Sequence, residues 1–187
     1  FAPFTNYRVA FNNIAVVDPL YTLPFLICMI VLMFFNRTSK NRQLWLKIGL
    51  GISSVYMIFT LMNKFYIDSI FRISLQESHV NYKRFSTQPA IFNNVLWFGI
   101  AETESAYYVT DYSLLDTKNR FIKFREVPKQ RYLKPSDYHD IKNLAWFSND
   151  YYSIYKLSNN EYQYNDLRYP LLDMENPNTS VFSLLLY

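Results

Sequence analysis

The sequence contains few of the residues on which catalytic and metal sites most often depend. Among 187 residues there are one cysteine, two histidines and three glycines. The single cysteine, Cys28, excludes an internal disulfide and a CxxC site, and we expect it to be a small apolar residue within a helix. His79 and His139 lie far apart and form no HxxxH or HExxH pattern, and neither a glycine-rich phosphate loop nor a GxSxG motif occurs. The chain therefore holds no complete catalytic set of its own.

Acidic residues are missing from two long apolar runs in the first third of the chain. Residues 20–35 carry no charge, and residues 44–65 carry only Lys47 and Lys64, which lie where a lysine can extend its ammonium group to a membrane interface. Each run approaches the ~20 apolar residues that cross a bilayer as a helix. A soluble protein would have to surround both helices, and the remaining residues are too few for that. We predict two transmembrane helices, at about residues 16–35 and 44–65.

The loop between these helices indicates how they are oriented. It holds Arg37, Lys40 and Arg42 and no acid, which the positive-inside rule places in the cytoplasm. The segment before the first helix and everything after Phe65 are then extracytoplasmic. The net charge of +4 is spread thinly along the chain, so we predict no nucleic-acid partner. The chain begins at Phe1, not at Met, and we expect further sequence before it.

Asp18 and Pro19 stand at the start of the first apolar run and allow two interpretations. Aspartate is a favoured N-cap and proline suits the first helical position, so the pair is typical of a helix start. A carboxylate at the edge of a transmembrane span can also serve a functional site, because burying it unpaired is costly. The cap is the stronger interpretation, and the two are compatible if one oxygen caps the helix and the other faces a site.

The rest of the chain changes from helical to strand patterns. Helical spacing continues past Phe65 as an amphipathic stalk to about residue 78, which ends a membrane region at residues 1–78. Residues 79–187 contain short runs rich in tyrosine and β-branched residues, with one helix at residues 134–148 whose expected N-cap is Ser136. Hairpins are predicted through ETES and through SNN, and Glu102 and Glu104, at the first turn, are expected to be solvated. The predicted fold class is therefore membrane α + β: two transmembrane helices followed by a mainly antiparallel β (α+β) extracytoplasmic domain.

Three stretches of the sequence resemble a known family. They are YRVAFNNIAVVDPLYTLPFLI, YKRFSTQPAIFNNVLWFGIAETESAYYVTDYSLLD and EYQYNDLRYP, and DPLYTLP is the most specific piece. Together they resemble the C-terminal part of the bacterial membrane-bound metal-dependent hydrolase family of the YbcI/YdjM type, in its long Bacteroidota-like form. That family's histidine- and aspartate-rich hallmarks, such as an HRGxTHS-like segment, do not occur in these residues.

The resemblance implies a multi-pass protein of the bacterial inner membrane with a periplasmic β-rich domain. It implies a divalent metal ion in the full-length protein and makes Asp18 a possible metal ligand, with the other ligands in upstream transmembrane helices. Such an ion would polarise a bound water for hydrolysis. The alternative is a non-enzymatic envelope subunit whose sheet domain binds another envelope protein. A transporter is disfavoured, because the two spans carry no charge along a pathway.

Overall fold

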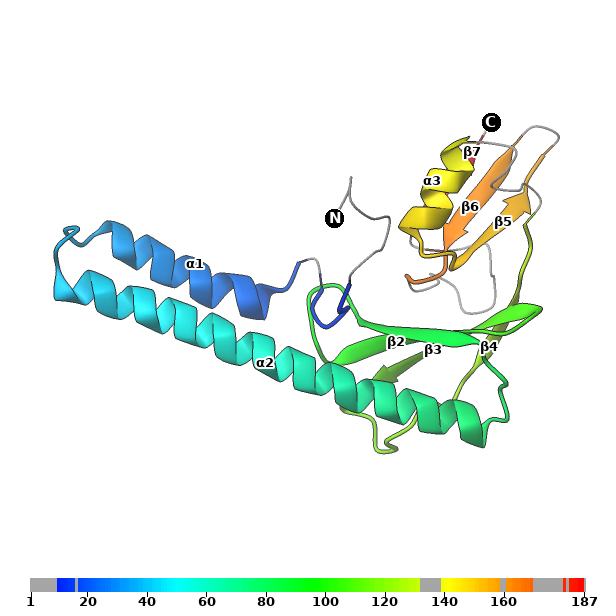
Figure 1. Ribbon diagram of the computed structural model, residues 1–187, viewed down its shortest axis with the longest axis horizontal. Coiled ribbons are helices and arrows are strands. Elements are labelled where there is room, and N and C mark those ends of the chain that lie inside the picture. The colour runs from blue at the N-terminus through cyan, green and yellow to red at the C-terminus, as the bar shows by residue number, and fades with distance from the viewer. Residues whose placement is uncertain are drawn as a thin grey trace. The chain divides into compact units, whose positions relative to one another are not determined.

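The computed structural model shows an α+β protein with antiparallel sheets. It describes residues 10–15, 17–131, 139–158, 161–169, 180 and 182–186. The helices and strands of these residues follow one another as α1 (Pro19–Met33), α2 (Lys40–Glu77), β1 (Arg84–Pro89), β2 (Leu96–Glu102), β3 (Ala106–Ser113), β4 (Arg125–Pro128), α3 (His139–Phe147), β5 (Tyr152–Lys156), β6 (Tyr162–Asp166) and β7 (Ser183–Leu186) (Figure 1). The chain divides into two units. A hairpin unit comprises Phe1–Ile67 and Gln88–Leu96, and a sheet unit comprises Asp68–Thr87 and Trp97–Tyr187.

The hairpin unit is built on α1 and α2, which run antiparallel. The guanidinium of Arg42, early in α2, donates to the carbonyl of Phe35 just beyond the end of α1, at 3.2 Å. Further along, α2 presents Gly49 to Cys28, and a Cβ added at Gly49 would lie 3.0 Å from the Cys28 Cβ. The glycine thus allows close approach of the two helices. Cys28 lies within α1, as expected, and is buried, and α1 continues through Pro24 to its end.

Helix α2 is continuous over 38 residues, from the apolar run into the predicted stalk. Its length and composition are sufficient to cross a membrane, whereas α1 is a shorter apolar helix of 15 residues. The predicted apolar stripe of the stalk is confirmed, because Ile67, Ile70, Phe71 and Leu75 are all buried. The last turns of α2 therefore use one face for packing while its other face carries the charged residues.

The first sheet of the sheet unit has the strand order β1-β2-β3-β4. Strands β2 and β3 are neighbours joined through Thr103–Ser105, as the sequence predicted, and β3 pairs antiparallel with β4. The run NRFIKFRE, residues 119–126, is rich in aromatic residues and predicts a strand, but only its last two residues, Arg125 and Glu126, belong to β4. Phe121 is instead buried in the core. Its amide donates a hydrogen bond to the Ser74 hydroxyl at 3.0 Å, and its ring centroid lies 4.8 Å from that of Phe71.

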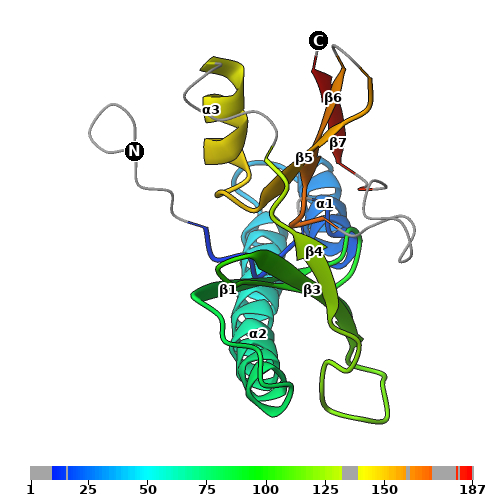
Figure 2. The same ribbon diagram turned by 90° about the vertical axis from the view of Figure 1, so that its right-hand side faces the viewer.

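The second sheet has the order β5-β6-β7, and both of its pairings are antiparallel. The hairpin predicted through SNN is confirmed, with Ile154 opposite Tyr164. Helix α3 covers one face of this sheet, where Ile141 and Ala145 pack on Tyr152, Ile154 and Tyr164 (Figure 2). The predicted helix is therefore present, although its expected N-cap, Ser136, lies outside the described residues.

The packing of Phe71 against β2 yields a stability prediction. A Cβ added at Gly99 would lie 2.3 Å from a ring carbon of Phe71, which is fully buried. Gly99→Ala must displace this ring, so we expect a loss of about 1–3 kcal/mol in unfolding free energy. The measurement is urea unfolding of the purified protein, followed by near-ultraviolet circular dichroism.

Gly51→Ala is the control, because a Cβ added at Gly51 meets nothing within 4 Å. Equal stability of the Gly99→Ala variant and the parent would show that the close approach of Phe71 to β2 does not exist in solution.

Candidate functional site

Asp18 uses its two carboxylate oxygens for two different purposes. Its backbone is extended, with φ −120° and ψ 105°, and Oδ1 accepts a hydrogen bond from the Leu20 amide at 3.0 Å. The N-cap prediction is thereby confirmed, with Pro19 at the first helical position. Oδ2 accepts a hydrogen bond from the Tyr56 hydroxyl of α2 at 2.8 Å. Asp18 is 2% exposed, so the carboxylate is buried and is paired on both sides.

A buried amide network continues from this corner along α2. The Asn13 side chain donates to the Thr60 hydroxyl at 2.8 Å, and Asn13 offers its backbone carbonyl to the Asn94 amide, also at 2.8 Å. Asn63, one turn further along α2, donates to the side-chain and backbone oxygens of Asn94. These bonds join α2 to the segment before α1 and to the connection Gln88–Leu96. We call Asn13, Thr60, Asn63 and Asn94 the amide network.

The geometry around Asp18 does not by itself make a metal centre. Within the part of the chain that the structure describes, no group of three or more His, Cys, Asp or Glu side chains lies close enough to hold a metal ion. His79 is exposed after the end of α2, and the side chain of His139 lies outside the described residues. One carboxylate with two intramolecular donors positions helices, and further ligands would be needed for an ion. The role of Asp18 as a metal ligand stays a prediction.

A second polar cluster lies in the sheet unit around Glu102, the last residue of β2. Its carboxylate accepts from the Lys129 ammonium at 2.7 Å and forms an ion pair with Arg84. The Glu102 side chain is 14% exposed, so the expectation that it is solvated is wrong, whereas Glu104 is 88% exposed as expected. Burial alone would raise the pKa of Glu102, but the hydrogen bonds from Lys129 and Arg84 together lower it.

Arginines next to this cluster lie over buried tyrosine rings. The guanidinium of Arg84 is 4.3 Å from the Tyr151 ring centroid, and that of Arg131 is 4.2 Å from the Tyr152 centroid. Arg131 also donates to the Tyr107 hydroxyl at 2.7 Å, which in turn donates to the Asp150 carbonyl. Burial raises the pKa of Tyr151 to about 12. Tyrosines of these strands thus form part of the core, since Tyr107, Tyr151, Tyr152 and Tyr164 are buried.

Sequence reasoning missed Tyr56, Asn63, Asn94 and the buried state of Glu102. Two signals were available for the first two residues, since a hydroxyl and an amide within an otherwise apolar run need a partner. Their partners lie 38 and 31 residues away in the chain, and no local spacing rule reaches that far. Glu102 is the last residue of β2, directly before the turn, so the sequence pattern alone could not separate a buried strand end from a solvated turn.

Comparison with known proteins adds no assignment to this geometry. No protein-family model, no curated protein and no solved structure matches the chain.

The double role of Asp18 predicts unequal effects of two substitutions. Tyr56→Phe removes one hydrogen bond to a charged group, and we expect it to lower the unfolding free energy of the hairpin by about 1.5–3 kcal/mol. Asp18→Ala removes that bond and the cap, which is worth a further ~1 kcal/mol. A double-mutant cycle in mixed micelles, read by helix content, measures the coupling. Strictly additive losses would mean that the Tyr56–Asp18 bond is absent.

Glu102 predicts an acid-sensitive sheet unit. Its pKa in the folded protein is below the usual 4.5, so its stabilising effect is complete above about pH 4.5 and is lost as the pH falls through the lower folded value. We expect Glu102→Gln to be less stable at neutral pH and to lose less stability on acidification. Thermal unfolding measured from about pH 3, where carboxylates titrate, to about pH 7 tests this. Glu104→Gln is the matched control, and an identical pH profile for both variants would contradict the role of Glu102.

Proposed function

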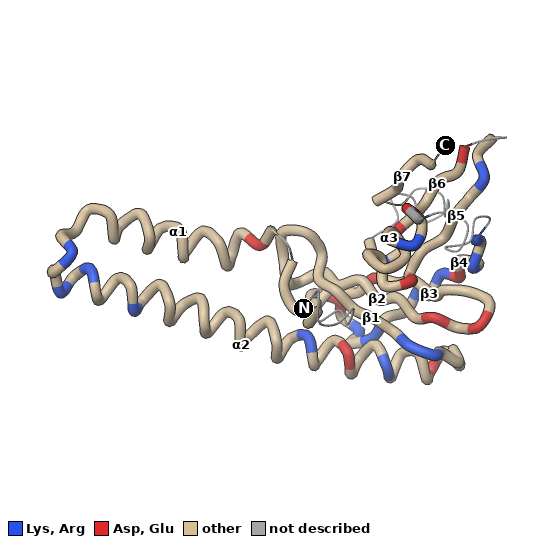
Figure 3. The backbone as a smooth tube through the Cα atoms, turned by 45° about the horizontal axis from the view of Figure 1, so that its top comes forward, with Lys and Arg blue, Asp and Glu red and all other residues tan. Residues whose placement is uncertain are grey.

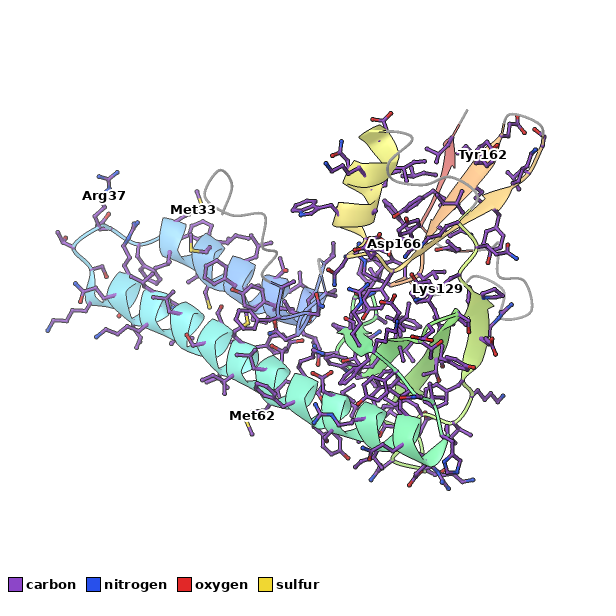
Figure 4. All side chains as sticks on the ribbon, turned by 45° about the vertical axis from the view of Figure 1, so that its right-hand side comes forward. Met33, Arg37, Met62, Lys129, Tyr162 and Asp166 are labelled. Atoms are coloured by element: carbon purple, nitrogen blue, oxygen red, sulfur yellow. The ribbon has the colours of Figure 1, made fainter. Side chains whose placement is uncertain are left out.

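We propose that α1 and α2 form a transmembrane hairpin that anchors the protein in a bacterial inner membrane. The observation that carries this proposal is the exposure of the apolar run. Only 11% of the most apolar 18-residue stretch of α2 is buried, which is unlike the core helix of a soluble protein. Large apolar side chains on both helices are exposed, among them Ile27, Ile30, Leu50 and Val55. Met33 on α1 and Met62 on α2 are exposed as well (Figure 4). A lipid environment would remove this surface from water.

The charges on the hairpin support one orientation in the membrane. The tip between the helices carries Arg37, Lys40 and Arg42, and Asp18 is at the opposite end of α1 (Figure 3). By the positive-inside rule the tip is cytoplasmic. The sheet unit then follows the extracytoplasmic end of α2, in the periplasm.

The two helices differ in the depth that they can span. The 15 residues of α1 cover roughly 22 Å, less than the ~30 Å of a hydrocarbon core. Helix α2 is long enough for the whole thickness. Beyond Asp18, α1 no longer lies beside α2. The segment before α1 and the connection Gln88–Leu96 lie there instead, and the amide network bonds both of them to α2. Because α1 is too short, the part of the hairpin beside the outer half of α2 can be completed only if these segments contribute to the anchor.

For the activity, we propose that the chain is the C-terminal part of a metal-dependent hydrolase of the YbcI/YdjM type. The support is the resemblance of the DPLYTLP region, together with the buried and oriented carboxylate of Asp18. Asp18 is a single acid, so the described residues do not fit a self-contained metal centre, and further ligands would come from other helices of the protein. A divalent ion bound there would supply a polarised water. Asp18 would then position that ion while its hydrogen bond from Tyr56 fixes the carboxylate.

The test is metal content and hydrolysis of a chromogenic phosphodiester by the complete membrane protein. We expect Asp18→Ala to abolish both, because a ligand is lost. Tyr56→Phe, which leaves the carboxylate but removes its second donor, is expected to lower metal affinity about 10-fold. His139→Ala is the control, with a smaller effect. Full activity of correctly inserted Asp18→Ala would end the assignment of Asp18 to the metal.

A second candidate function is a non-enzymatic envelope subunit that binds another envelope protein. The observation that favours it is the end of the second sheet, where β7 pairs with β6 and exposes Leu184 and Leu185. An edge strand of this kind can accept a further strand from a partner. Stable co-purification with envelope proteins, from full-length material that contains no metal, would favour this function over the hydrolase.

A further inference from the structure

The connection between β1 and β2 carries two exposed apolar residues in an unusual backbone conformation. Ile91 is 46% exposed and Phe92 is 60% exposed. Phe92 has φ 75°, in the left-handed region that a bulky side chain rarely adopts. An arrangement of this kind persists only where its surroundings fix it, and it is often found at functional sites. These two residues belong to the hairpin unit, because Gln88–Leu96 is part of it.

The backbone of this connection is held by several hydrogen bonds. The Phe92 amide donates to the Val17 carbonyl at 3.1 Å, and the Ala90 amide donates to the Leu96 carbonyl at 2.8 Å. The Asn93 side chain accepts from the Leu96 amide at 2.9 Å, and Asn94 belongs to the amide network. These bonds pair many of the loop's polar groups within the protein, while the side chains of Ile91 and Phe92 are exposed. Paired backbone groups are what an apolar environment requires.

The hydrogen bond from the Phe92 amide to the Val17 carbonyl also fixes the position of this loop along the length of the helical hairpin. Val17 immediately precedes the cap of α1, and both Val17 and Leu20 are exposed, as is Phe11 upstream. We call these five residues the apolar collar: Phe11, Val17, Leu20, Ile91 and Phe92. The segments that carry them are joined by the amide network and by the Phe92–Val17 bond.

Helix α2 keeps exposed apolar side chains at the level of the apolar collar, beside the buried Thr60 and Asn63 and the charged Lys64. The hydrogen bond from Tyr56 to Asp18 places the start of α1 beside Tyr56 of α2. Phe59, Met62 and Phe65 lie further along α2, beyond the start of α1, and their side chains are 52%, 66% and 72% exposed. At that level the neighbours of α2 are Asn13 and Asn94, on the segments that carry the collar. If α2 is in lipid as far as Phe65, the segments beside it lie at the same depth.

We propose that the apolar collar, with Ile91 and Phe92 at its tip, inserts into the outer leaflet at the boundary between headgroups and acyl chains. The occupant of this surface is lipid, because the collar continues the lipid-facing surface of the hairpin and the connection Gln88–Leu96 carries no charge. The collar extends the anchor beyond the short helix α1. This inference rests on the proposed transmembrane hairpin.

The test measures the depth of a fluorophore in vesicles of phosphatidylcholine and phosphatidylglycerol. In a Cys28→Ala background, a single cysteine is placed at Ile91 or at Met29, in the middle of α1, and labelled with nitrobenzoxadiazole. Lipids brominated near the headgroup or deep in the acyl chain then quench by proximity. We expect the probe at Met29 to be quenched more by the deep lipid. The probe at Ile91 should lose about half of its emission to the shallow lipid, consistent with a depth of about 5–10 Å below the interface.

The outcomes separate this inference from the proposed anchor. Quenching at Met29 with none at Ile91 would overturn the insertion of the collar and leave the hairpin intact. No quenching at either position would remove both. If Cys28→Ala does not fold, Phe92→Trp in the unaltered chain provides the same measurement, read as the difference from the parent's three tryptophans. A tryptophan at position 92 that shallow brominated lipid does not quench would equally overturn the proposal.

Discussion

The carboxylate of Asp18 takes part both in the local structure of a helix start and in the packing of that helix on another. One oxygen accepts from the Leu20 amide and starts α1, and the other accepts from Tyr56 and fixes α1 against α2. If a buried carboxylate had a single hydrogen-bond donor, most of the free-energy cost of its desolvation would remain uncompensated. The helix start and the helix pairing are therefore coupled, since neither donor alone satisfies the group. The level at which α1 begins along α2 follows from this one side chain.

Features governed by short spacing could be predicted from the sequence. The Asp18–Pro19 cap, the buried stripe at Ile67 and Phe71, and the β5–β6 hairpin all depend on residues within a few positions of one another. In each case the physics is local: a cap needs an oxygen next to free amides, and a stripe needs the helical repeat. The antiparallel α+β architecture of the sheet unit was predictable for the same reason.

Features governed by distant partners could not be predicted. Glu102 is buried because Arg84 and Lys129 converge on it from β1 and from the residue that follows β4, 18 and 27 positions away. Phe121 leaves its expected strand because Phe71 and Ser74 of α2 provide an aromatic contact and a hydroxyl acceptor. A sequence pattern reflects the local conformational preference of each residue, whereas the burial of Glu102 and the position of Phe121 depend on tertiary contacts with distant segments. The same limit applies to Tyr56 as the partner of Asp18.

The amide network explains why asparagines lie within an otherwise apolar region. Asn63 follows an apolar run in α2, where an unpaired amide would be costly in lipid, yet its donor is taken up by Asn94. Asn94 in turn donates to the carbonyl of Asn13, so each amide satisfies a group that has no regular secondary structure to satisfy it. Irregular backbone is tolerated at membrane depth only when its polar groups are paired within the protein. In the proposed membrane anchor, the network would pair the polar groups of the segments beside α2, as helical hydrogen bonding does for α1. These segments would then cover the part of α2 that the short helix α1 does not reach.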